Sequence, residues 1–166
     1  MHLTKTAIQK ICDEGDFSRP VVVVGFGLGE GGVAEEVARR MSPTSRLLII
    51  EGDAEQAAIL KERFMHDERV EVFHGLTQDA EKISKQLHIE GVDAVFGGSY
   101  LVHADHQTQA KTIIAIKNML KSEGIFITFS GIATAQPYLK QEFSRIGEKN
   151  IWQNFPPVRM SIAKKA

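Results

Sequence analysis

The sequence has a single cysteine, Cys12, among its 166 residues. One thiol cannot form an internal disulfide, so we expect a reducing, cytoplasmic location for this chain. No apolar stretch approaches the roughly 18 residues that a membrane span needs. The opening residues, MHLTK, lack the apolar centre of a secretory signal peptide. From these absences we do not expect a disulfide scaffold, a transmembrane protein or a secreted protein.

The chain also has no excess of either charge, because its 20 Lys and Arg nearly balance its 21 Asp and Glu and the net charge is -1. This balance excludes a strongly basic nucleic-acid binder, and we expect no nucleic-acid partner. The length predicts one domain over residues 1–166, in which residues 1–19 form an N-terminal helix and lead-in. Because a second catalytic lobe has no room, a cofactor and a substrate would share one sheet. The sequence indicates no oligomeric state.

Strand-like and helix-like segments alternate along the chain, with short connections. Val21–Val24 is a continuous β-branched run of the kind that is buried inside parallel sheets. Apolar spacing predicts further strands at 47–50, 70–73, 92–96 and 125–129, and helices at 3–14, 33–41, 53–64, 79–87, 107–121 and 138–146. We expect Asp53 to cap the helix that follows it, and Gly124 to end the helix over 107–121.

The last part of the chain breaks this alternation. Ile151-Trp152 and Val158–Ile162 are typical of two short antiparallel strands on either side of Asn154-Phe155-Pro156-Pro157. We expect Trp152 to pack in the core beneath them. The whole pattern predicts an α/β fold, a Rossmann-like open and mostly parallel seven-stranded sheet with a C-terminal antiparallel hairpin and helices on both faces. Ligands of such sheets bind at the carboxyl ends of the strands.

A glycine-rich turn follows the first predicted strand directly. Gly25-Phe26-Gly27-Leu28-Gly29 permits positive φ angles and a close approach of a ligand to the backbone. The helix start beyond it offers unpaired N–H groups. Glu51 closes the second strand, where a carboxylate can accept both hydroxyl groups of a ribose. These features predict a nucleoside-cofactor site, although a plain strand-to-helix turn and a capping acid would use the same residue types.

Two cofactor classes fit the glycine spacing. Counted from Gly25, the turn is GxGxG, the form used for S-adenosylmethionine. Counted from Gly27, residues 27–32 read GLGEGG, a literal GxGxxG, and Glu51 lies 19 residues beyond Gly32, near the dinucleotide spacing. The spacing therefore leaves S-adenosylmethionine and NAD both open.

From Pro20 onward the sequence resembles the class I S-adenosylmethionine-dependent methyltransferases. The resemblance is carried by VVVVGFGLGEGG, LLIIEGDAEQAAILKERF, VEVFHGLTQDA, GVDAVFGGS and MLKSEGIFITFS. The ending IWQNFPPVRMSIAKK resembles the closing strand pair of the bacterial phospholipid N-methyltransferases, which are related to the rRNA adenine dimethylases. Asn154, Pro156 and Pro157 match that family's N-x-P-P element. The resemblance implies a transferase that uses S-adenosylmethionine to methylate a small-molecule or lipid amine.

The resemblance and the order of the strands together assign residues to a site. The cofactor would be bound by Gly25, Gly27, Gly29, Glu51, Gly52 and Gly97, with Leu76 and Thr77 flanking its adenine. The acceptor would contact Ser99 and Asn154. Tyr100 would stack on or orient the nucleophile, and His103 would take its proton. Both residue types also fit plainer roles, Tyr100 as a loop aromatic that covers the pocket edge and His103 as a polar residue that leads into the next helix. We expect no metal, because no third ligand accompanies His103 and His106.

Three positions depart from the family's pattern. Val23 and Leu76 stand where the family usually has acids, and Gly97-Gly98-Ser99-Tyr100 replaces a Ser-Gly-Leu-Pro turn. A lost charged hydrogen bond costs roughly 1.5–3 kcal/mol of affinity. These departures keep a second hypothesis open, a non-catalytic NAD- or nucleotide-binding Rossmann module with a regulatory role.

Two other resemblances are local. Gly97-Gly98-Ser99 resembles the decarboxylating precorrin methyltransferases, and VVVVGFG with IEGVDAV resembles the NAD-binding regulatory domains of potassium transport systems. Only 19 residues precede Pro20, and they mix basic and acidic side chains. We therefore do not expect the membrane-seeking N-terminal region of the phospholipid enzymes.

Overall fold

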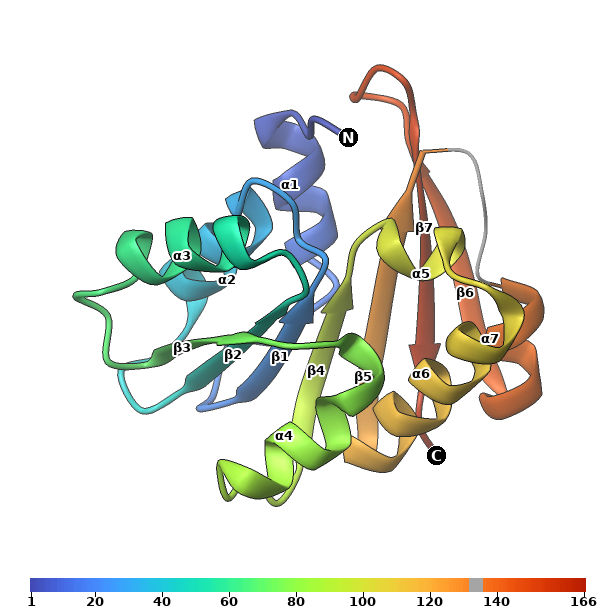
Figure 1. Ribbon diagram of the computed structural model, residues 1–166. Coiled ribbons are helices and arrows are strands. Elements are labelled where there is room, and N and C mark those ends of the chain that lie inside the picture. The colour runs from blue at the N-terminus through green and yellow to red at the C-terminus, as the bar shows by residue number, and fades with distance from the viewer. Residues whose placement is uncertain (132–135) are drawn as a thin grey trace.

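The computed structural model describes residues 1–131 and 136–166, which form one seven-stranded sheet with helices on both faces (Figure 1). The strands are β1 (Val22–Phe26), β2 (Arg46–Glu51), β3 (Val70–His74), β4 (Val92–Gly97), β5 (Leu120–Ser130), β6 (Arg145–Ile151) and β7 (Val158–Lys164). The helices are α1 (Lys5–Cys12), α2 (Gly32–Arg40), α3 (Ala54–Arg63), the 3-10 turn η1 (Thr77–Asp79), α4 (Ala80–Gln86), α5 (Tyr100–His103), α6 (His106–Met119) and α7 (Gln136–Glu142).

The strand order is β3-β2-β1-β4-β5-β7-β6. β1 pairs in parallel with β2 and β4, whereas β7 pairs antiparallel with β5 and β6. This arrangement confirms the predicted fold class, including the C-terminal hairpin. The chain reverses its direction of travel across the sheet between β1 and β4, so their carboxyl ends flank the switch point at which ligands of such sheets bind.

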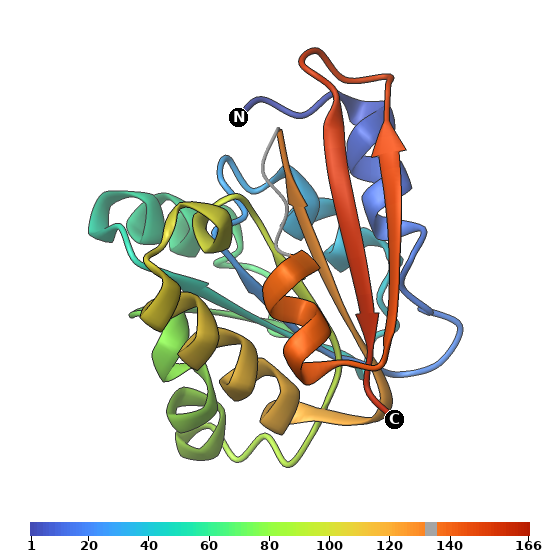
Figure 2. The ribbon, with the colours of Figure 1, turned by 90° about the vertical axis from the view of Figure 1, so that its right-hand side faces the viewer.

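Two apolar layers cover the sheet. One face of the sheet, where Val23 is buried, is covered by α1, α2 and α3. The other face, where Val24 is buried, is covered by α4, α5, α6 and α7. Successive residues of a strand point to opposite faces, so a strand buried on both sides is apolar at every position, as in this β-branched run. Figure 2 shows α1 on one side of the β6–β7 hairpin and α7 on the other.

β1 runs further than the sequence predicts. Gly25 lies inside the strand, opposite Ile49 of β2 and Phe96 of β4, and not in the turn. A Cβ at Gly25 would stand 2.5 Å from the Leu28 side chain, which folds back over the strand. The prediction that the turn begins at Gly25 is therefore wrong, because ladders on both sides extend β1 through Phe26.

The end of α6 also differs from the prediction. The helix ends at Met119, and Gly124 lies within β5, so Gly124 does not end the helix. Lys165 closes the helix end, since its Nζ donates hydrogen bonds to the carbonyl oxygens of Lys117 and Leu120 at 2.7 and 2.6 Å. A contact made by a residue so distant in sequence carries no local signal.

The closing hairpin is longer than predicted. α7 ends at Glu142, and Ile146, expected in that helix, pairs with Ala163 across the hairpin. Ile151, the last residue of β6, is buried in the core. Trp152 follows it and is 71% exposed, so its predicted core packing is wrong. The next residue after a buried strand position points the other way, which here is toward solvent.

Candidate functional site

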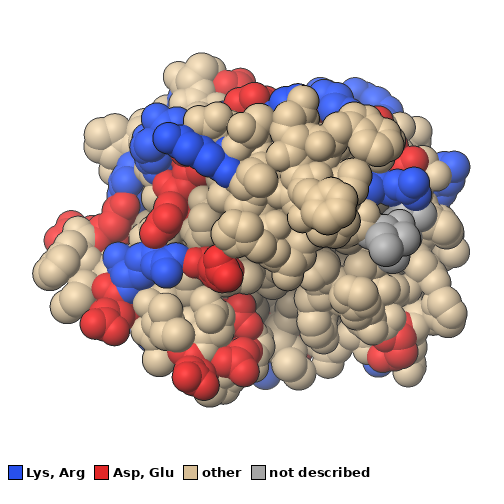
Figure 3. Space-filling view, turned by 90° about the horizontal axis from the view of Figure 1, so that it is seen from above, with Lys and Arg blue, Asp and Glu red and all other residues tan. Residues whose placement is uncertain are grey.

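A cavity of about 390 Å³ opens at the carboxyl ends of β1, β2 and β3. It is lined by Gly27, Glu51, Gly52, Asp53, Gly75, Leu76, Thr77 and Tyr100. Its volume falls within the roughly 300–1,000 Å³ of small-molecule sites. Seen from above, uncharged residues occupy the middle of this end of the molecule, and many of the charged side chains gather to the left (Figure 3). The cavity lies where the topology predicts a ligand.

The loop after β1 contains three glycines with left-handed backbone, at φ values of 56° for Gly27, 64° for Gly29 and 87° for Gly31. Side chains of α3 hold this loop, because Gln56 Nε2 donates to the Gly29 carbonyl at 3.0 Å and Arg63 donates to the Glu30 carbonyl. Gly27 lines the cavity, and Gly29 has open space where a Cβ would stand. The backbone of this loop is thus both fixed and accessible.

Glu51 ends β2 at the cavity wall. One of its oxygens, Oε1, accepts a hydrogen bond from the Asp53 backbone N–H at 2.9 Å. Asp53 in turn caps α3, because its carboxylate accepts from the Gln56 N–H at 2.8 Å, as predicted. The Gly75 N–H donates to the Glu51 carbonyl at 2.9 Å and joins the ends of β2 and β3. The carboxylate of Glu51 is therefore held in place beside the cavity.

The end of β4 crosses very close to the end of β1. The Gly98 N–H donates to the Phe26 carbonyl at 2.9 Å, and a Cβ at Gly98 would lie 1.8 Å from the Gly27 carbonyl oxygen. A Cβ at Gly97 would stand 2.6 Å from the Phe26 ring. Only glycine fits at Gly98, so this residue sets the spacing between the two loops that meet at the switch point.

The helix α5 begins beside the cavity. Tyr100 lines it and is 44% exposed, and a Cβ on Gly27 would meet the Tyr100 Cβ at 3.1 Å. Ser99 is the N-cap position of this helix, and His103 is its last residue and is exposed. The structure therefore places Tyr100 at the cavity, with Ser99 next to it in the chain and His103 one turn further on.

His103 and His106 lie in different helices, since Ala104 and Asp105 separate α5 from α6. His106 instead hydrogen-bonds to the Tyr138 hydroxyl through Nδ1. Within residues 1–131 and 136–166, no group of three His, Cys, Asp or Glu side chains is arranged to hold a metal ion. Burial raises the pKa of the Cys12 thiol to about 12, which removes it as a thiolate nucleophile.

Asn154 does not reach the cavity. Its side chain is buried, and its Oδ1 accepts from the Thr4 N–H at 2.7 Å. Its Nδ2 donates to the carbonyls of His2 and Pro156 at 3.2 and 2.9 Å. These bonds use the amide to fasten the hairpin to the N-terminal segment, so the sequence prediction of direct acceptor contact is not supported by its position.

Of the other predicted residues, Gly27, Glu51, Gly52, Leu76, Thr77 and Tyr100 converge on the cavity. The remaining predicted residues are not among those that line it in the described part of the chain, namely Gly25, Gly29, Gly97, Ser99 and His103. Asp53 and Gly75 also line the cavity, although the sequence did not assign them to the site. A signal for Gly75 existed, because it lies two residues beyond the predicted strand over 70–73, at the ligand-binding edge.

The departures from the family pattern have visible consequences. Val23 is fully buried in the apolar layer beneath α1 and α2, so an acid there would need a partner. Leu76 is 48% exposed at the cavity wall, and Thr77 beside it is buried. The adenine side of the predicted site is therefore apolar at Leu76.

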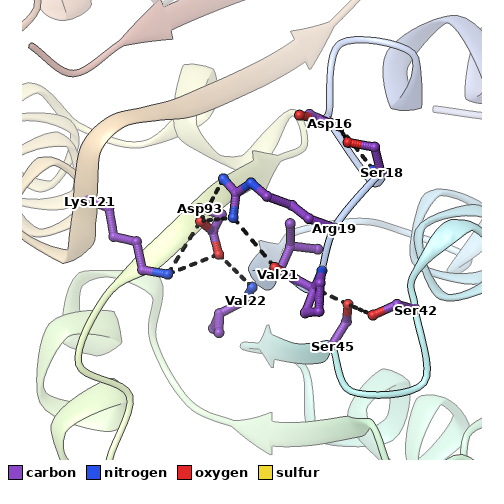
Figure 4. A network of polar contacts seen from close by, with 10 residues as sticks. Asp16, Ser18, Arg19, Val21, Val22, Ser42, Ser45, Asp93 and Lys121 are labelled. Carbon is purple, nitrogen blue, oxygen red and sulfur yellow. Dashed lines mark hydrogen bonds and ion pairs between the residues drawn. The ribbon is translucent and has the colours of Figure 1, made fainter.

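A second cavity, of about 290 Å³, lies at the opposite end of the sheet, beside Asp93. The carboxylate of Asp93 is only 8% exposed and accepts hydrogen bonds from the Val22 N–H, Arg19 and Lys121 (Figure 4). Burial raises its pKa, but these hydrogen bonds and the Lys121 charge outweigh burial and hold the pKa below its ordinary value. The acid here is already paired, which indicates a structural role.

No helix in the described part of the chain is long and apolar enough to cross a membrane.

Known proteins resemble the chain in sequence and in fold. No family model matches it. It is 29% identical over 143 residues, 86% of this chain and 70% of the relative, to an ornithine lipid N-methyltransferase from Singulisphaera acidiphila. The precorrin-6y C5,15-methyltransferase of Geobacter metallireducens has a similar structure, with a TM-score of 0.78 at 15% identity, covering 99% of this chain and 90% of that one.

A third similar protein is a SAM-dependent O-methyltransferase of Thermotoga maritima. Its TM-score is 0.73 at 18% identity, and the match covers 100% of this chain and 67% of that one. Together with the strand order, these likenesses show the Rossmann-like fold of the methyltransferases.

Proposed function

We propose that this chain is an S-adenosylmethionine-dependent methyltransferase that methylates the amine of a small or amphiphilic acceptor, lipid amines included. The activity class and the cofactor are supported by the curated methyltransferase relative and by the methyltransferases that share its fold. The observation that carries the proposal is the cavity at the switch point, which has Glu51 on one wall and the glycine loop on another.

The residues around the cavity fit this cofactor. Glu51 is fixed through one oxygen by the Asp53 N–H and stands where its carboxylate can accept the ribose hydroxyl groups. Gly27 and Gly29 would face the amino-acid portion, since their left-handed backbone brings N–H groups toward a ligand without side chains in the way. Gly52 and Gly97 would add backbone contacts at the ends of β2 and β4.

The adenine would lie against Leu76 and Thr77. Leu76 offers an exposed apolar side chain, and Thr77 lines the cavity at the start of η1. Gly25 would act indirectly, because Leu28 fills the space above it and fixes the loop.

The cofactor supplies an electrophilic methyl group on its sulfonium. The chain must align the acceptor nitrogen with that methyl group and exclude water. Tyr100, at the cavity mouth, would orient the amine. His103, one turn further along α5, would take the proton, because an amine attacks only in its neutral form. Ser99 would contact the acceptor at the N-terminal end of the same helix.

The choice of an amine rests on two supports. The curated relative is an N-methyltransferase of a lipid, and the ending of this chain contains the matching Asn154-Phe155-Pro156-Pro157 element. The two methyltransferase structures above act on carbon and on oxygen by their names, so they support methyl transfer but not its acceptor. None of these three proteins is named as an rRNA adenine dimethylase, so we do not propose an rRNA acceptor.

Isothermal titration with S-adenosylhomocysteine tests the cofactor, with NADH titrated in parallel. We expect a single site for S-adenosylhomocysteine and no heat with NADH. Tight binding of NADH without binding of S-adenosylhomocysteine would overturn the proposal and favour the regulatory nucleotide-binding module.

Radiolabelled methyl transfer then tests the acceptor. The labelled cofactor is incubated with an amine-bearing lipid, with a water-soluble amine, and with an oxygen acceptor such as catechol. Label in an amine-containing product is the expected result, whereas label in the catechol product alone would contradict N-methylation. Tyr100→Phe separates the two roles of Tyr100, because it keeps the ring that stacks and removes the hydroxyl that orients.

A further inference from the structure

Two aromatic side chains stand in solvent at the tip of the β6–β7 hairpin. We call residues 152–157, Trp152-Gln153-Asn154-Phe155-Pro156-Pro157, the aromatic tip. Trp152 is 71% exposed and Phe155 is 95% exposed. Such side chains usually bury most of their surface in a folded protein. Their joint exposure on one turn makes an apolar surface of the kind that binds a partner or a membrane.

The aromatic tip is held in place by the N-terminal segment. Beyond the three hydrogen bonds of buried Asn154, Thr4 Oγ1 donates to the Gln153 carbonyl at 3.1 Å, and Lys10 Nζ donates to Gln153 Oε1 at 3.0 Å. Because Asn154 points inward and is pinned, Trp152 and Phe155 on either side are kept outward. The exposure is thus built by the fold and is not a property of a loose loop.

The two chain segments around the tip carry basic side chains. Residues 1–12 and 149–159 build this corner, and they contain Lys5, Lys10, Lys149 and Arg159 but no Asp or Glu. Lys149 is paired with Glu14 at 2.5 Å, whereas Lys10 is held by an uncharged amide. Lys5 and Arg159 are exposed. Two acids also lie at this corner, because Glu14 pairs with Lys149 and Glu30 approaches His2 at 3.6 Å. Lys5, Lys10 and Arg159 therefore supply the positive charge that would complement the phosphates of an anionic surface.

The tip lies at the end of the molecule that holds the candidate site. Figure 1 shows the β6–β7 loop and the N-terminus rising above the carboxyl ends of the parallel strands. Tyr100 and Leu76, both half-exposed, lie on the cavity at the same end. A surface that receives the tip would therefore face the mouth of the cavity.

We propose that the aromatic tip inserts Trp152 and Phe155 into the interfacial region of an anionic phospholipid bilayer and so presents the cavity to amines of lipid headgroups. Tryptophan and other amphipathic aromatics favour this depth, and neighbouring basic side chains add attraction to anionic lipids. The proposal rests on the proposed function for the identity of the lipid amine. It does not require a membrane-seeking N-terminal region.

Trp152 is the single tryptophan of the chain, so its fluorescence reports on the tip without a label. The full chain is titrated with vesicles of phosphatidylcholine and phosphatidylglycerol in equal amounts. We expect a blue shift of the emission and protection from acrylamide quenching, with weaker binding to vesicles of phosphatidylcholine alone. Unchanged emission and quenching in both vesicle types would overturn the proposal.

Phe155→Ser tests the insertion while leaving Trp152 as the reporter. Burial of one large apolar side chain is worth at least about a ten-fold change in partitioning, so the variant should bind vesicles about ten-fold more weakly. Met65→Ser is the matched control, because Met65 is 67% exposed and lies just beyond α3, away from the hairpin. An equal loss for both variants would contradict a specific role for the tip.

Two further measurements separate this proposal from its alternatives. S-adenosylhomocysteine titration of the same samples should give the same affinity for wild type and Phe155→Ser. Cofactor binding without vesicle binding overturns the membrane proposal alone, whereas vesicle binding without cofactor binding overturns the proposed function alone. Analytical sedimentation tests whether the aromatic tip binds a second copy of the chain instead. If the wild type is a dimer that does not bind vesicles, and Phe155→Ser is a monomer, the tip serves self-association and the membrane proposal is overturned.

Discussion

The two ends of the parallel sheet use the same strands in opposite ways. At the amino end, the carboxylate of Asp93 in β4 is nearly buried and takes hydrogen bonds from β1 and from two basic side chains. At the carboxyl end, β4 ends at Gly97 and β1 ends directly before Gly27, and the nearby Leu76 and Tyr100 are half-exposed around an open cavity. At the amino end, β1 is linked to β4 by the carboxylate of Asp93. At the carboxyl end, the two strands are linked by contacts between backbone atoms.

This difference separates stability from binding. A paired, buried acid contributes to folding because removing its partners leaves it unsatisfied. A glycine loop with positive φ contributes little to folding and exposes backbone groups to a ligand. We therefore expect substitutions at the amino end to change unfolding, and substitutions at the carboxyl end to change cofactor affinity. Gly98 is the exception, since it lies at the point where the two loops touch.

Gly98→Ala should have the largest effect. A Cβ there would lie 1.8 Å from the Gly27 carbonyl oxygen, so the ends of β1 and β4 must separate. We expect the affinity for S-adenosylhomocysteine to fall by about 100-fold and the free energy of unfolding to fall by about 3 kcal/mol. Titration calorimetry and urea unfolding measure the two quantities.

Gly147→Ala is the matched control for that substitution, because no atom lies within 4 Å of a Cβ at Gly147 in β6. It should leave the affinity unchanged and raise the free energy of unfolding by at most about 1 kcal/mol. Wild-type affinity in Gly98→Ala would show that the contact between the loops does not shape the cavity.

Asp93→Asn should act on the other end of the sheet. We expect a loss of about 2 kcal/mol in the free energy of unfolding, because the hydrogen bonds from Arg19 and Lys121 lose their charge. Affinity for S-adenosylhomocysteine should stay within about two-fold of wild type. Glu71→Gln is the control, since Glu71 and Arg46 form a half-exposed pair that should contribute at most about 1 kcal/mol.

The pH dependence of unfolding tests whether the charge of Asp93 causes this loss of stability. The folded pKa of Asp93 lies below the ordinary value of 3.8, so the contribution of its carboxylate to stability is complete above that pH and is lost as pH falls through the folded pKa. The gap between wild type and Asp93→Asn should therefore narrow in acid below about pH 4. A gap that stays constant with pH would assign the loss to packing.

Glu51→Gln should weaken binding without unfolding the chain. The amide keeps an oxygen that can accept from the Asp53 N–H, but it loses the charge that would bind the ribose hydroxyls. We expect about a ten-fold loss of affinity, equal to about 1.4 kcal/mol, with the urea midpoint unchanged. A large fall in the urea midpoint would instead mean that Glu51 serves the fold, as Asp93 does.

Much of this arrangement can be read from local sequence. The β-branched run at Val21–Val24 and the acid at Glu51 suffice to place β1, β2 and the edge where a ligand binds. The cap at Asp53 follows from its position before an apolar helix, and the hairpin follows from the prolines between two short strands. Each of these signals lies within a few residues of the feature it predicts.

The errors arise where distant contacts decide. Gly25 joins β1 because β2 and β4 pair with it on both sides, and α6 ends at Met119 because Leu120 is extended and pairs with Val92 of β4. Asn154 turns inward because Thr4 and His2 lie beside the hairpin, which in turn exposes Trp152. No local pattern reports that the N-terminal segment and residues 152–157 are neighbours.

Leu76→Asp should have the smallest effect, and it is a gain. Leu76 is 48% exposed at the cavity, so a carboxylate there keeps its water and does not disturb the core. The methyltransferase resemblance places an acid at this position against the adenine, and a net hydrogen bond of about 0.5–1 kcal/mol would tighten S-adenosylhomocysteine binding by about three-fold. Met65→Asp, also at an exposed apolar position, should leave the affinity unchanged. Weaker binding in Leu76→Asp would mean that the adenine lies elsewhere in the cavity. If Leu76→Asp alone raises the affinity, the carboxyl end of the sheet can accept a new carboxylate that binds the ligand. At the amino end, by contrast, the carboxylate of Asp93 already has its partners within the fold.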